Sequence, residues 1–297
     1  MTERTHPWHG IMVATALPLR DDLSVDYDAY AGHCRWLVEN GCDGVVPNGS
    51  LGEYQTLTPE ERAKVLETAV EAVGGDRVMA GAGAYGAAES RRWAERAAEL
   101  GCGSVLLLPP NAYRADERAV LAHYREVARA GVPVVGYNNP YDTKVDLTPA
   151  LLARLHEEGL IVAVKEFTGD PRRAYEIAEL APGLDLLIGS DDALLELALA
   201  GAVGWIAGYP NALPASTVAL YRAAVAHDLE TALPLYKQLH PLLRWDSKTE
   251  FVQAIKLSMD VAGRPGGPCR EPRQPLTAEQ EAAVRALTEK ALAEGLR

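Results

Sequence analysis

Short apolar runs alternate with longer amphipathic stretches over most of the chain. Eight runs rich in Val, Ile and Leu lack strict apolar–polar alternation, which is typical of parallel strands buried on both faces. The eight predicted strands cover residues 11–17, 43–47, 77–81, 103–108, 132–137, 160–165, 184–188 and 202–207. Helical patterns fill the gaps, for example at 58–73, which opens on the cap-like Thr58-Pro59-Glu60-Glu61, and at 87–100.

Glycines punctuate this alternation where a helix would end just before a strand. They are Gly41, Gly75, Gly101, Gly131, Gly159, Gly183 and Gly201. Two of these strand–helix units contain the same residue pairs: Arg35-Trp36 is followed by Gly41-Cys42, and Arg92-Trp93 is followed by Gly101-Cys102. Such internal sequence similarity favours a closed repeat architecture. Eight strand–helix units therefore predict an α/β fold, a (β/α)8 TIM barrel, with a doubly wound parallel sheet as the alternative.

Beyond the last predicted strand the pattern becomes purely helical. The predicted helices there cover 213–227, 229–244, 248–262 and 277–295, and a Gly/Pro-rich loop from Gly263 to Pro275 separates the last two. We therefore expect a catalytic barrel over residues 1–212 and a C-terminal helical region, 213–297, packed on it.

Composition narrows the class of protein. The 297 residues are 48% apolar and 24% charged, which is ordinary globular composition. The net charge of −12 argues against nucleic acid or an anionic membrane as the main partner, but not against a small anion held by a local site. No apolar stretch is long enough for a membrane span, and residues 1–10 lack a signal-peptide pattern. We expect a cytoplasmic protein with a small-molecule partner.

Cysteines and histidines give no sign of a metal or of a catalytic triad. Cys34, Cys42, Cys102 and Cys269 lie far apart without a C-x-x-C pair, so we expect reduced, mostly buried thiols. The seven histidines are scattered, without metal-ligand spacing.

A barrel carries its chemistry at the carboxyl ends of its strands, and there Lys165 is the strongest candidate. It closes the apolar run 161–164, so its amine is expected to be buried. Desolvation lowers the pKa of an ammonium group and leaves more of the neutral amine, the nucleophile that forms a Schiff base with a carbonyl. The structural alternatives are an ion pair with Glu166 or another carboxylate, or a side chain that reaches the barrel rim.

Two further features lie at neighbouring strand ends. Tyr137 ends the preceding strand, and adjacent strands are about 4.8 Å apart, so its phenol can lie beside the Lys165 amine and move protons; a packed barrel aromatic is the alternative. The glycine-flanked Ser50-Leu51 turn can present consecutive backbone N–H groups to a carboxylate, although a plain tight turn also fits.

Four segments in order carry a family resemblance. They are Gly49-Ser50-Leu51-Gly52-Glu53, Tyr137-Asn138-Asn139-Pro140, Val164-Lys165-Glu166-Phe167-Thr168-Gly169-Asp170 and Gly189-Ser190-Asp191-Asp192. They resemble the G-[ST]-x-G-E, Y-N-x-P, lysine and G-x-D-D motifs of the dihydrodipicolinate synthase / N-acetylneuraminate lyase family of class I aldolases. The resemblance runs from about residue 8 to 275, and the spacing between Tyr137 and Lys165 also fits.

The resemblance implies a site and a chemistry. A 2-keto acid would form an imine with Lys165, its carboxylate would rest on the Ser50 and Leu51 amides, and Tyr137 would relay protons, with the Ser50 hydroxyl as a link. The protonated imine withdraws electrons, so no metal and no cofactor are required. Further substrate-binding residues implied are Gly49, Asn139, Gly189, Ala207 and Tyr209. Members are commonly homotetramers built as dimers of dimers.

Three departures argue against dihydrodipicolinate synthesis itself. Leu51 replaces the second hydroxyl residue of the glycine loop, and residues 109–112 replace a tyrosine pair, with Tyr113 displaced. Asp142 stands where the family carries an arginine for the second substrate's carboxylate. The exit of the last strand, 208–211, does not resemble the sugar-reading segment of neuraminate lyases either.

The favoured reaction is therefore that of a Schiff-base lyase acting on a small 2-keto acid or cyclic imine. The G-S-L-G-E loop and the Y-N-N-P motif look more like those of catabolic members that dehydrate, deaminate or cleave small keto acids. Among these we favour a deaminase of a hydroxylated pyrroline carboxylate. Alternatives within the family are dihydrodipicolinate synthase proper and aldolases or dehydratases of 2-keto-3-deoxy sugar acids or 4-hydroxy-2-oxoglutarate. Outside it stand a non-catalytic ligand-binding barrel and a metal-dependent aldolase. Arg114, Lys144 and Tyr209 are candidate substrate contacts, with surface solvation as the alternative for the two cations.

Overall fold

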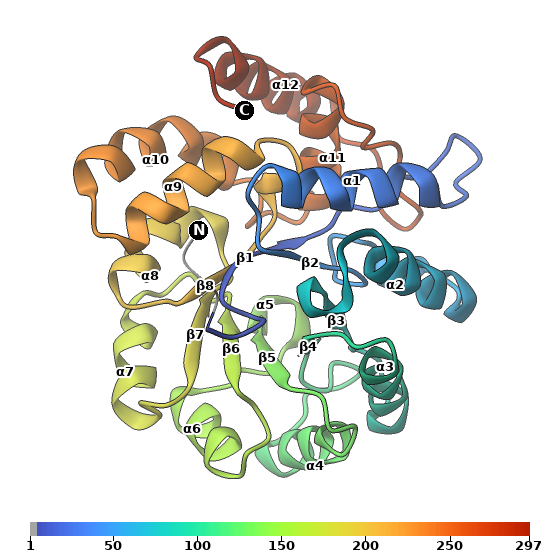
Figure 1. Cartoon of the computed structure of the whole chain (residues 1–297), viewed down its shortest axis with the longest axis vertical. Coiled ribbons are helices and arrows are strands. Elements are labelled where there is room, and N and C mark those ends of the chain that lie inside the picture. Colours follow the sequence, from blue (N-terminus) through green and yellow to red (C-terminus); the bar gives the residue numbers. More distant parts are fainter. Residues whose placement is uncertain (1–4) are drawn as a thin grey trace.

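The computed structural model describes residues 5–297 and contains one eight-stranded parallel barrel (Figure 1). Its strands are β1 (Gly10–Ala14), β2 (Gly44–Val46), β3 (Met79–Gly81), β4 (Ser104–Leu107), β5 (Val134–Asn138), β6 (Ala163–Glu166), β7 (Asp185–Ile188) and β8 (Gly204–Ala207). Each overlaps one of the eight predicted strands, so these predictions are confirmed.

The strands are paired in the order β2-β1-β8-β7-β6-β5-β4-β3, and a parallel bridge between Val45 and Val78 closes the ring between β2 and β3. This closure confirms the TIM barrel and shows that the doubly wound alternative is wrong. On β1, Met12 packs inside the barrel, whereas Ile11 and Val13 pack outward against the helices. Both strand faces are thus buried, which explains the missing apolar–polar alternation.

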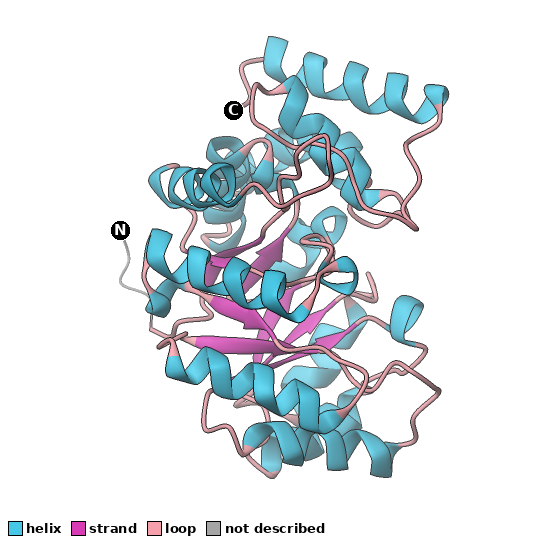
Figure 2. Cartoon of the chain, turned by 90° about the vertical axis from the view of Figure 1, so that its right-hand side faces the viewer, coloured by secondary structure: helices cyan, strands magenta, loops and turns pink. Residues whose placement is uncertain are grey.

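Helices surround the barrel in an outer layer (Figure 2). They are α1 (Tyr27–Glu39), α2 (Pro59–Val73), α3 (Ala87–Glu99), α4 (Glu117–Ala128), α6 (Pro149–Glu157), α7 (Arg172–Leu180), α8 (Leu194–Leu199) and α9 (Pro214–Val225), with a short α5 (Pro140–Thr143) directly after β5. The predicted start of α2 is confirmed, because Thr58 and Glu61 form a reciprocal capping box with Pro59 in the first turn.

The C-terminal helices α10 (Leu229–Leu243), α11 (Phe251–Val261) and α12 (Ala278–Ala293) lie together at one end of the molecule (Figure 1). They match the predicted helices, except that α11 begins later than residue 248, because residues 244–250 form turns. Helix α9 packs against both α8 and α10 and so links the barrel to this region. The division at residue 212 stays a prediction.

The segment 81–86 has the letters G-A-G-A-Y-G, which fit the spacing of a dinucleotide-binding loop. In the barrel this segment connects β3 to α3. A Cβ on Gly81 would lie 2.1 Å from the Asn48 carbonyl oxygen, so glycine is needed there for the close approach of β2 and β3. The letters therefore reflect barrel packing rather than a doubly wound fold.

All four cysteines are free thiols; Cys34, Cys42 and Cys102 are buried and Cys269 is half-buried. None of the helices in the described part of the chain is both long and apolar enough to cross a membrane.

One buried ion pair joins the C-terminal region to the barrel. Lys256 of α11 lies 2.8 Å from Glu53, which follows the turn after β2, and both side chains are 1% exposed. The second Glu53 carboxylate oxygen accepts the backbone N–H of Arg270 at 2.9 Å. Glu53 adopts a left-handed φ of 53°, a conformation that is unfavourable for residues other than glycine. Its contacts with Lys256 and Arg270 hold it in this conformation and so fix the end of the Ser50-Leu51 turn.

We predict that Lys256→Met lowers the free energy of unfolding by about 3–5 kcal/mol, because it leaves the Glu53 charge buried without its cation. Urea unfolding followed by circular dichroism measures this loss. Lys290→Met, in an exposed pair with Glu294, is the control and should cost less than about 1 kcal/mol. Equal effects of the two substitutions would contradict the role assigned to the buried pair.

Candidate active site

A cavity of about 880 Å³ opens at the carboxyl ends of the barrel strands. Each of the eight strands, or the loop directly after it, contributes to its lining, and residues 246–249, Phe251 and Arg273 of the C-terminal region contribute from the other side. This is the face on which TIM barrels carry their active sites. The site is thus shared between the barrel and the C-terminal helices.

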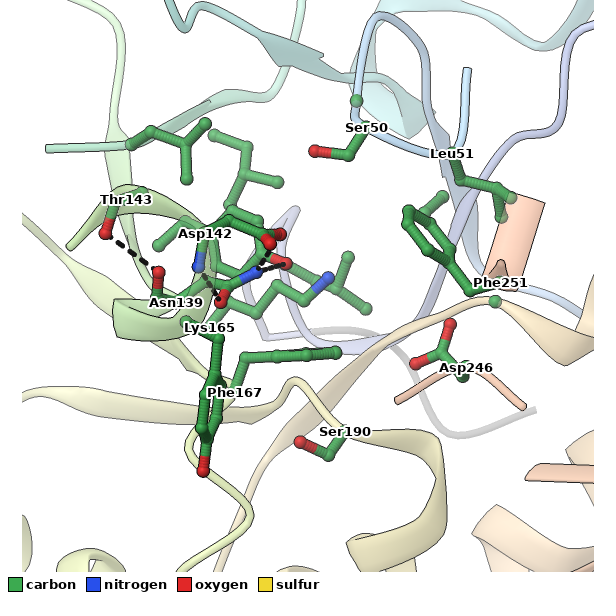
Figure 3. A pocket seen from close by; sticks show the side chains of 18 of the residues that line it. Ser50, Leu51, Asn139, Asp142, Thr143, Lys165, Phe167, Ser190, Asp246 and Phe251 are labelled. Carbon is green, nitrogen blue, oxygen red and sulfur yellow. Dashed lines mark hydrogen bonds between the residues drawn. The ribbon is translucent and has the colours of Figure 1, made fainter. Parts of the chain in front are cut away.

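Lys165 projects into this cavity from β6 (Figure 3). It is 7% exposed, and its amine forms no salt bridge or hydrogen bond with any residue in the range 5–297. The Nζ atom lies 4.4 Å from the centre of the Tyr137 ring and 5.5 Å from that of Phe167. The predicted proximity of Lys165 and Tyr137 is confirmed, because the two residues are register partners on β5 and β6.

The structural alternatives for Lys165 do not hold. Glu166 points to the other face of β6, where it pairs with Arg173 at 3.2 Å and accepts the Asn138 side-chain amide at 3.0 Å. Successive side chains on a strand face opposite ways, so this acid cannot reach the amine. The burial of Lys165 also excludes a side chain extended to the solvent at the rim.

Burial and two nearby acids determine the ionisation of Lys165. Desolvation lowers the pKa of the amine, while the charges of Asp246 and Asp191 act against that decrease. Burial in turn raises the pKa of both carboxyl groups. The amine is therefore held in an environment that favours its neutral, nucleophilic form.

Tyr137 presents its ring face to the amine, and its hydroxyl accepts a hydrogen bond from the Asn139 side-chain amide at 3.3 Å. Asn139 also donates to Asp142 at 2.8 Å (Figure 3). Burial raises the pKa of Tyr137 well above its usual value, so the phenol stays protonated. The Asn139 amide donates to the Tyr137 hydroxyl oxygen, so the proton of that hydroxyl remains free to bond another acceptor.

The turn after β2 carries the predicted carboxylate cradle. Within the described part of the chain, the backbone N–H groups of Ser50 and Leu51 donate to no acceptor, and both residues line the cavity. Asn48 before them and Glu53 after them adopt left-handed φ angles of 58° and 53°, which makes the turn tight. Unpaired amides in such a turn are suited to an anion.

The structure brings most, but not all, of the predicted site residues together. Those that line the cavity are Gly49, Ser50, Leu51, Tyr137, Asn139 and Lys165. Gly189, Ala207 and Tyr209 lie outside the lining. On β8, Ile206 faces the barrel interior, so Ala207 faces the outer core, where Tyr209 is also buried. Gly189 lies against the Glu166 carbonyl, 2.3 Å from where a Cβ would be.

The two candidate surface cations and the displaced tyrosine take no part in the cavity lining. Arg114 and Lys144 are exposed, and Tyr113 is 60% exposed. Asp142, by contrast, does line the cavity. The acid therefore lies inside the site, as its position in the sequence implied.

Asp246 and Arg273 are site residues that the sequence did not predict. Asp246 enters the cavity more deeply buried than Arg273. It lies in the turns between α10 and α11, is 8% exposed and lines the cavity. The local sequence around Asp246 does not distinguish a buried acid from a solvated one, because the segment connects two amphipathic helices. Asp191, which belongs to the G-x-D-D letters, accepts hydrogen bonds from Trp205 and from the backbone of Gly208 and Tyr209.

Together, the fold and the cavity define an α/β-barrel protein with a small-molecule site at the carboxyl ends of its strands. Residues 7–291 match the dihydrodipicolinate synthetase family, and the chain belongs to that family. Membership makes it a lyase.

Individual relatives agree over nearly the whole chain. The 4-hydroxy-tetrahydrodipicolinate synthase of Methanothrix thermoacetophila is 34% identical over 281 residues, which cover 94% of this chain and 95% of the relative. A putative dihydrodipicolinate synthetase from Pseudomonas aeruginosa has a TM-score of 0.90 and 31% identity, covering 95% of this chain and 99% of that one. YagE from Escherichia coli K12, solved with pyruvate, has a TM-score of 0.88 and 26% identity, covering 97% and 99%. The tetrameric assembly and the cytoplasmic location stay predictions.

We predict that the Lys165 amine is acylated by acetic anhydride at lower pH than the amine of N-acetyl-lysine amide. Its lowered pKa leaves a larger neutral fraction at any pH below the usual lysine range. Competitive labelling across pH, followed by peptide mass spectrometry, measures the midpoint. In urea-unfolded protein the difference should disappear, and coincident midpoints in the folded protein would refute the prediction.

Proposed function

We propose that this lyase forms a Schiff base between Lys165 and a small 2-keto acid or its cyclic imine. The observation that carries the proposal is the buried Lys165 amine, which has no salt bridge or hydrogen bond among the described residues and faces the cavity. A neutral amine in that position can attack the carbonyl carbon directly. The intact pair of Lys165 and Tyr137 also argues against a barrel that only binds a ligand, because an unpaired buried amine is costly.

The turn after β2 supports a keto acid as the substrate. A 2-keto acid carries its carboxylate next to the reacting carbonyl, so a site for it needs an anion cradle near the amine. The unpaired Ser50 and Leu51 N–H groups provide that cradle without a formal charge. Local dipoles of this kind act at short range, so the net charge of −12 does not oppose them.

In the proposed mechanism, Tyr137 supplies and recovers protons while the imine forms, with the Ser50 hydroxyl as a link. Its phenol remains protonated in the buried site and has its proton free to donate. Once the imine is protonated, it withdraws electrons from the neighbouring carbon. Dehydration, deamination or carbon–carbon cleavage then becomes accessible, with the imine itself as the electron sink.

Among the substrates of this class, we favour a hydroxylated pyrroline carboxylate, which the enzyme would deaminate. Its ring imine can exchange directly onto Lys165, which opens the ring. Leu51 and Asp142 line the cavity where a hydroxyl relay and a cation would serve dihydrodipicolinate synthesis. An acid at position 142 suits a substrate that carries an amine and a hydroxyl group there rather than a second carboxylate.

One observation favours a second candidate. Arg273 also lines the cavity, and its guanidinium lies 5.1 Å from the centre of the Phe251 ring. An arginine there could bind a second carboxylate, as in 4-hydroxy-2-oxoglutarate. A panel that measures ammonia release from the hydroxylated pyrroline carboxylate and pyruvate release from 4-hydroxy-2-oxoglutarate distinguishes the two reactions, and condensation of pyruvate with aspartate semialdehyde tests the activity named for the relatives.

We predict that borohydride added with pyruvate reduces an imine on Lys165 and leaves a covalent adduct that peptide mass spectrometry locates. Lys165→Ala should lose both the adduct and the turnover. Lys237→Ala, which removes an exposed lysine of α10, is the matched control and should keep both. An unmodified Lys165 under conditions that trap a known class I aldolase would refute the proposed function.

We predict that Tyr137→Phe slows turnover by about 10²–10⁴-fold, the usual range for a lost general acid–base group. The adduct with pyruvate should still be trapped after long incubation, because the ring that packs beside the amine remains. Steady-state rates and the final amount of reduced adduct measure the two effects separately. Turnover within threefold of the unsubstituted enzyme would exclude the proton relay.

A further inference from the structure

Asp246 is a buried acid of the cavity to which the proposed function assigns no role. Its carboxyl group enters the site from the C-terminal region, whereas Lys165 enters it from β6 (Figure 3). Among the described residues, its one hydrogen-bond donor is the backbone N–H of Asp191, at a long 3.5 Å. A Cβ on Gly208 would lie 2.4 Å from the Asp246 Oδ1 atom, so a glycine there makes room for the carboxyl group.

The neighbouring acid Asp191, in contrast to Asp246, accepts several hydrogen bonds. Asp191 accepts the Trp205 indole N–H at 2.9 Å, the Tyr209 N–H at 2.8 Å and the Gly208 N–H at 3.1 Å. Hydrogen bonds from donors favour the ionised form of a carboxyl group. Of the two neighbouring acids, Asp191 is therefore the one whose negative charge the protein stabilises, whereas Asp246 lacks such donors and burial raises its pKa.

The surroundings of Asp246 link its proton to the state of Lys165. The titratable groups that face it are Lys165, Asp191, Asp192, Tyr137 and Tyr209. Burial and the Asp191 charge raise its pKa, and a positive charge on Lys165 lowers it. A protonated imine on Lys165 carries that positive charge, so imine formation favours release of the Asp246 proton.

We propose that Asp246 is the catalytic acid–base that removes the proton from the carbon next to the imine carbon and then protonates the hydroxyl group that leaves from the following carbon. This inference rests on the proposed function, since it requires the imine on Lys165. The amine and the acid line one cavity and form no salt bridge with each other. A substrate attached to Nζ would occupy the cavity that the acid also lines.

The proton balance of these steps closes. Asp246 first gives its proton to the ring nitrogen, and one of the two protons of the neutral Lys165 amine also moves there, so that this nitrogen leaves the imine carbon as a primary amine and the new imine on Lys165 keeps the other proton. The carboxylate then takes a proton from the adjacent carbon, and the electrons of that C–H bond form the double bond of the enamine. Finally Asp246 returns this proton to the hydroxyl group; the C–O bond breaks, water leaves, and the enamine electrons form the new carbon–carbon double bond of a conjugated imine.

Pyruvate in D₂O tests the inference without knowledge of the natural substrate. The enzyme should exchange the pyruvate methyl protons for deuterium, which proton NMR follows, because the imine and the enamine interconvert. In Asp246→Asn, which keeps the shape but cannot carry the proton, we expect the exchange rate to fall by about 10²–10⁴-fold. The adduct trapped by borohydride after long incubation should stay at the level of the unsubstituted enzyme.

Asp228→Asn is the matched control, because it makes the same change in the C-terminal region at an exposed N-cap of α10 that lies outside the cavity lining, and asparagine caps a helix as well as aspartate. It should keep both trapping and exchange. Asp246→Glu restores an acid and should recover part of the exchange. Thermal melting confirms that each variant is folded.

The outcomes separate this inference from the proposed function. Failure to trap pyruvate on the unsubstituted enzyme would refute the Schiff base itself. Normal trapping with exchange within threefold in Asp246→Asn would refute the role of Asp246 alone and assign the carbon proton to another group. Loss of trapping in a folded Asp246→Asn would also overturn the inference, because the acid would then be needed to hold the substrate.

Discussion

An amine buried without a partner is the constraint on which the site depends. The Lys165 Nζ atom lies against the rings of Tyr137 and Phe167 and forms no ion pair with any of residues 5–297, although two acids, Asp246 and Asp191, are near it. Desolvation of the ammonium form costs free energy that a salt bridge would recover, and the barrel maintains this state because the register of β5 and β6 fixes the lysine beside the tyrosine. The same lack of a partner leaves the amine available to a carbonyl group.

Other parts of the site are positioned by residues of the C-terminal region, far away in the sequence. The turn that offers the Ser50 and Leu51 amides ends at Glu53, which Lys256 of α11 holds in a buried ion pair. Asp246 comes from the turns before the same helix. The C-terminal helices thus complete the cavity as well as cover the barrel, so the regions predicted on either side of residue 212 both line it.

The sequence motifs predicted those candidate residues whose position depends on local structure. Lys165 and Tyr137 stand at the ends of apolar runs, and the Ser50-Leu51 turn stands between glycines, so strand ends and turn geometry were enough to predict them. The residues implied by the family resemblance also included Gly189, Ala207 and Tyr209, which lie outside the cavity lining. A shift of one residue along a strand reverses the side-chain direction, and apolar letters on both faces of β8 cannot reveal which face is inside.

The sequence by itself determined the strand–helix alternation, the starts of helices such as α2 and the segments that meet at the carboxyl ends of the strands. These follow from interactions between near neighbours in the chain: periodic burial, caps and turns. Only the tertiary structure decided that the ring closes between β2 and β3, that Glu166 pairs away from Lys165, and that Asp246 enters the cavity. Those facts depend on packing between residues far apart in sequence, where burial and partners, rather than local letters, set the state of each charge.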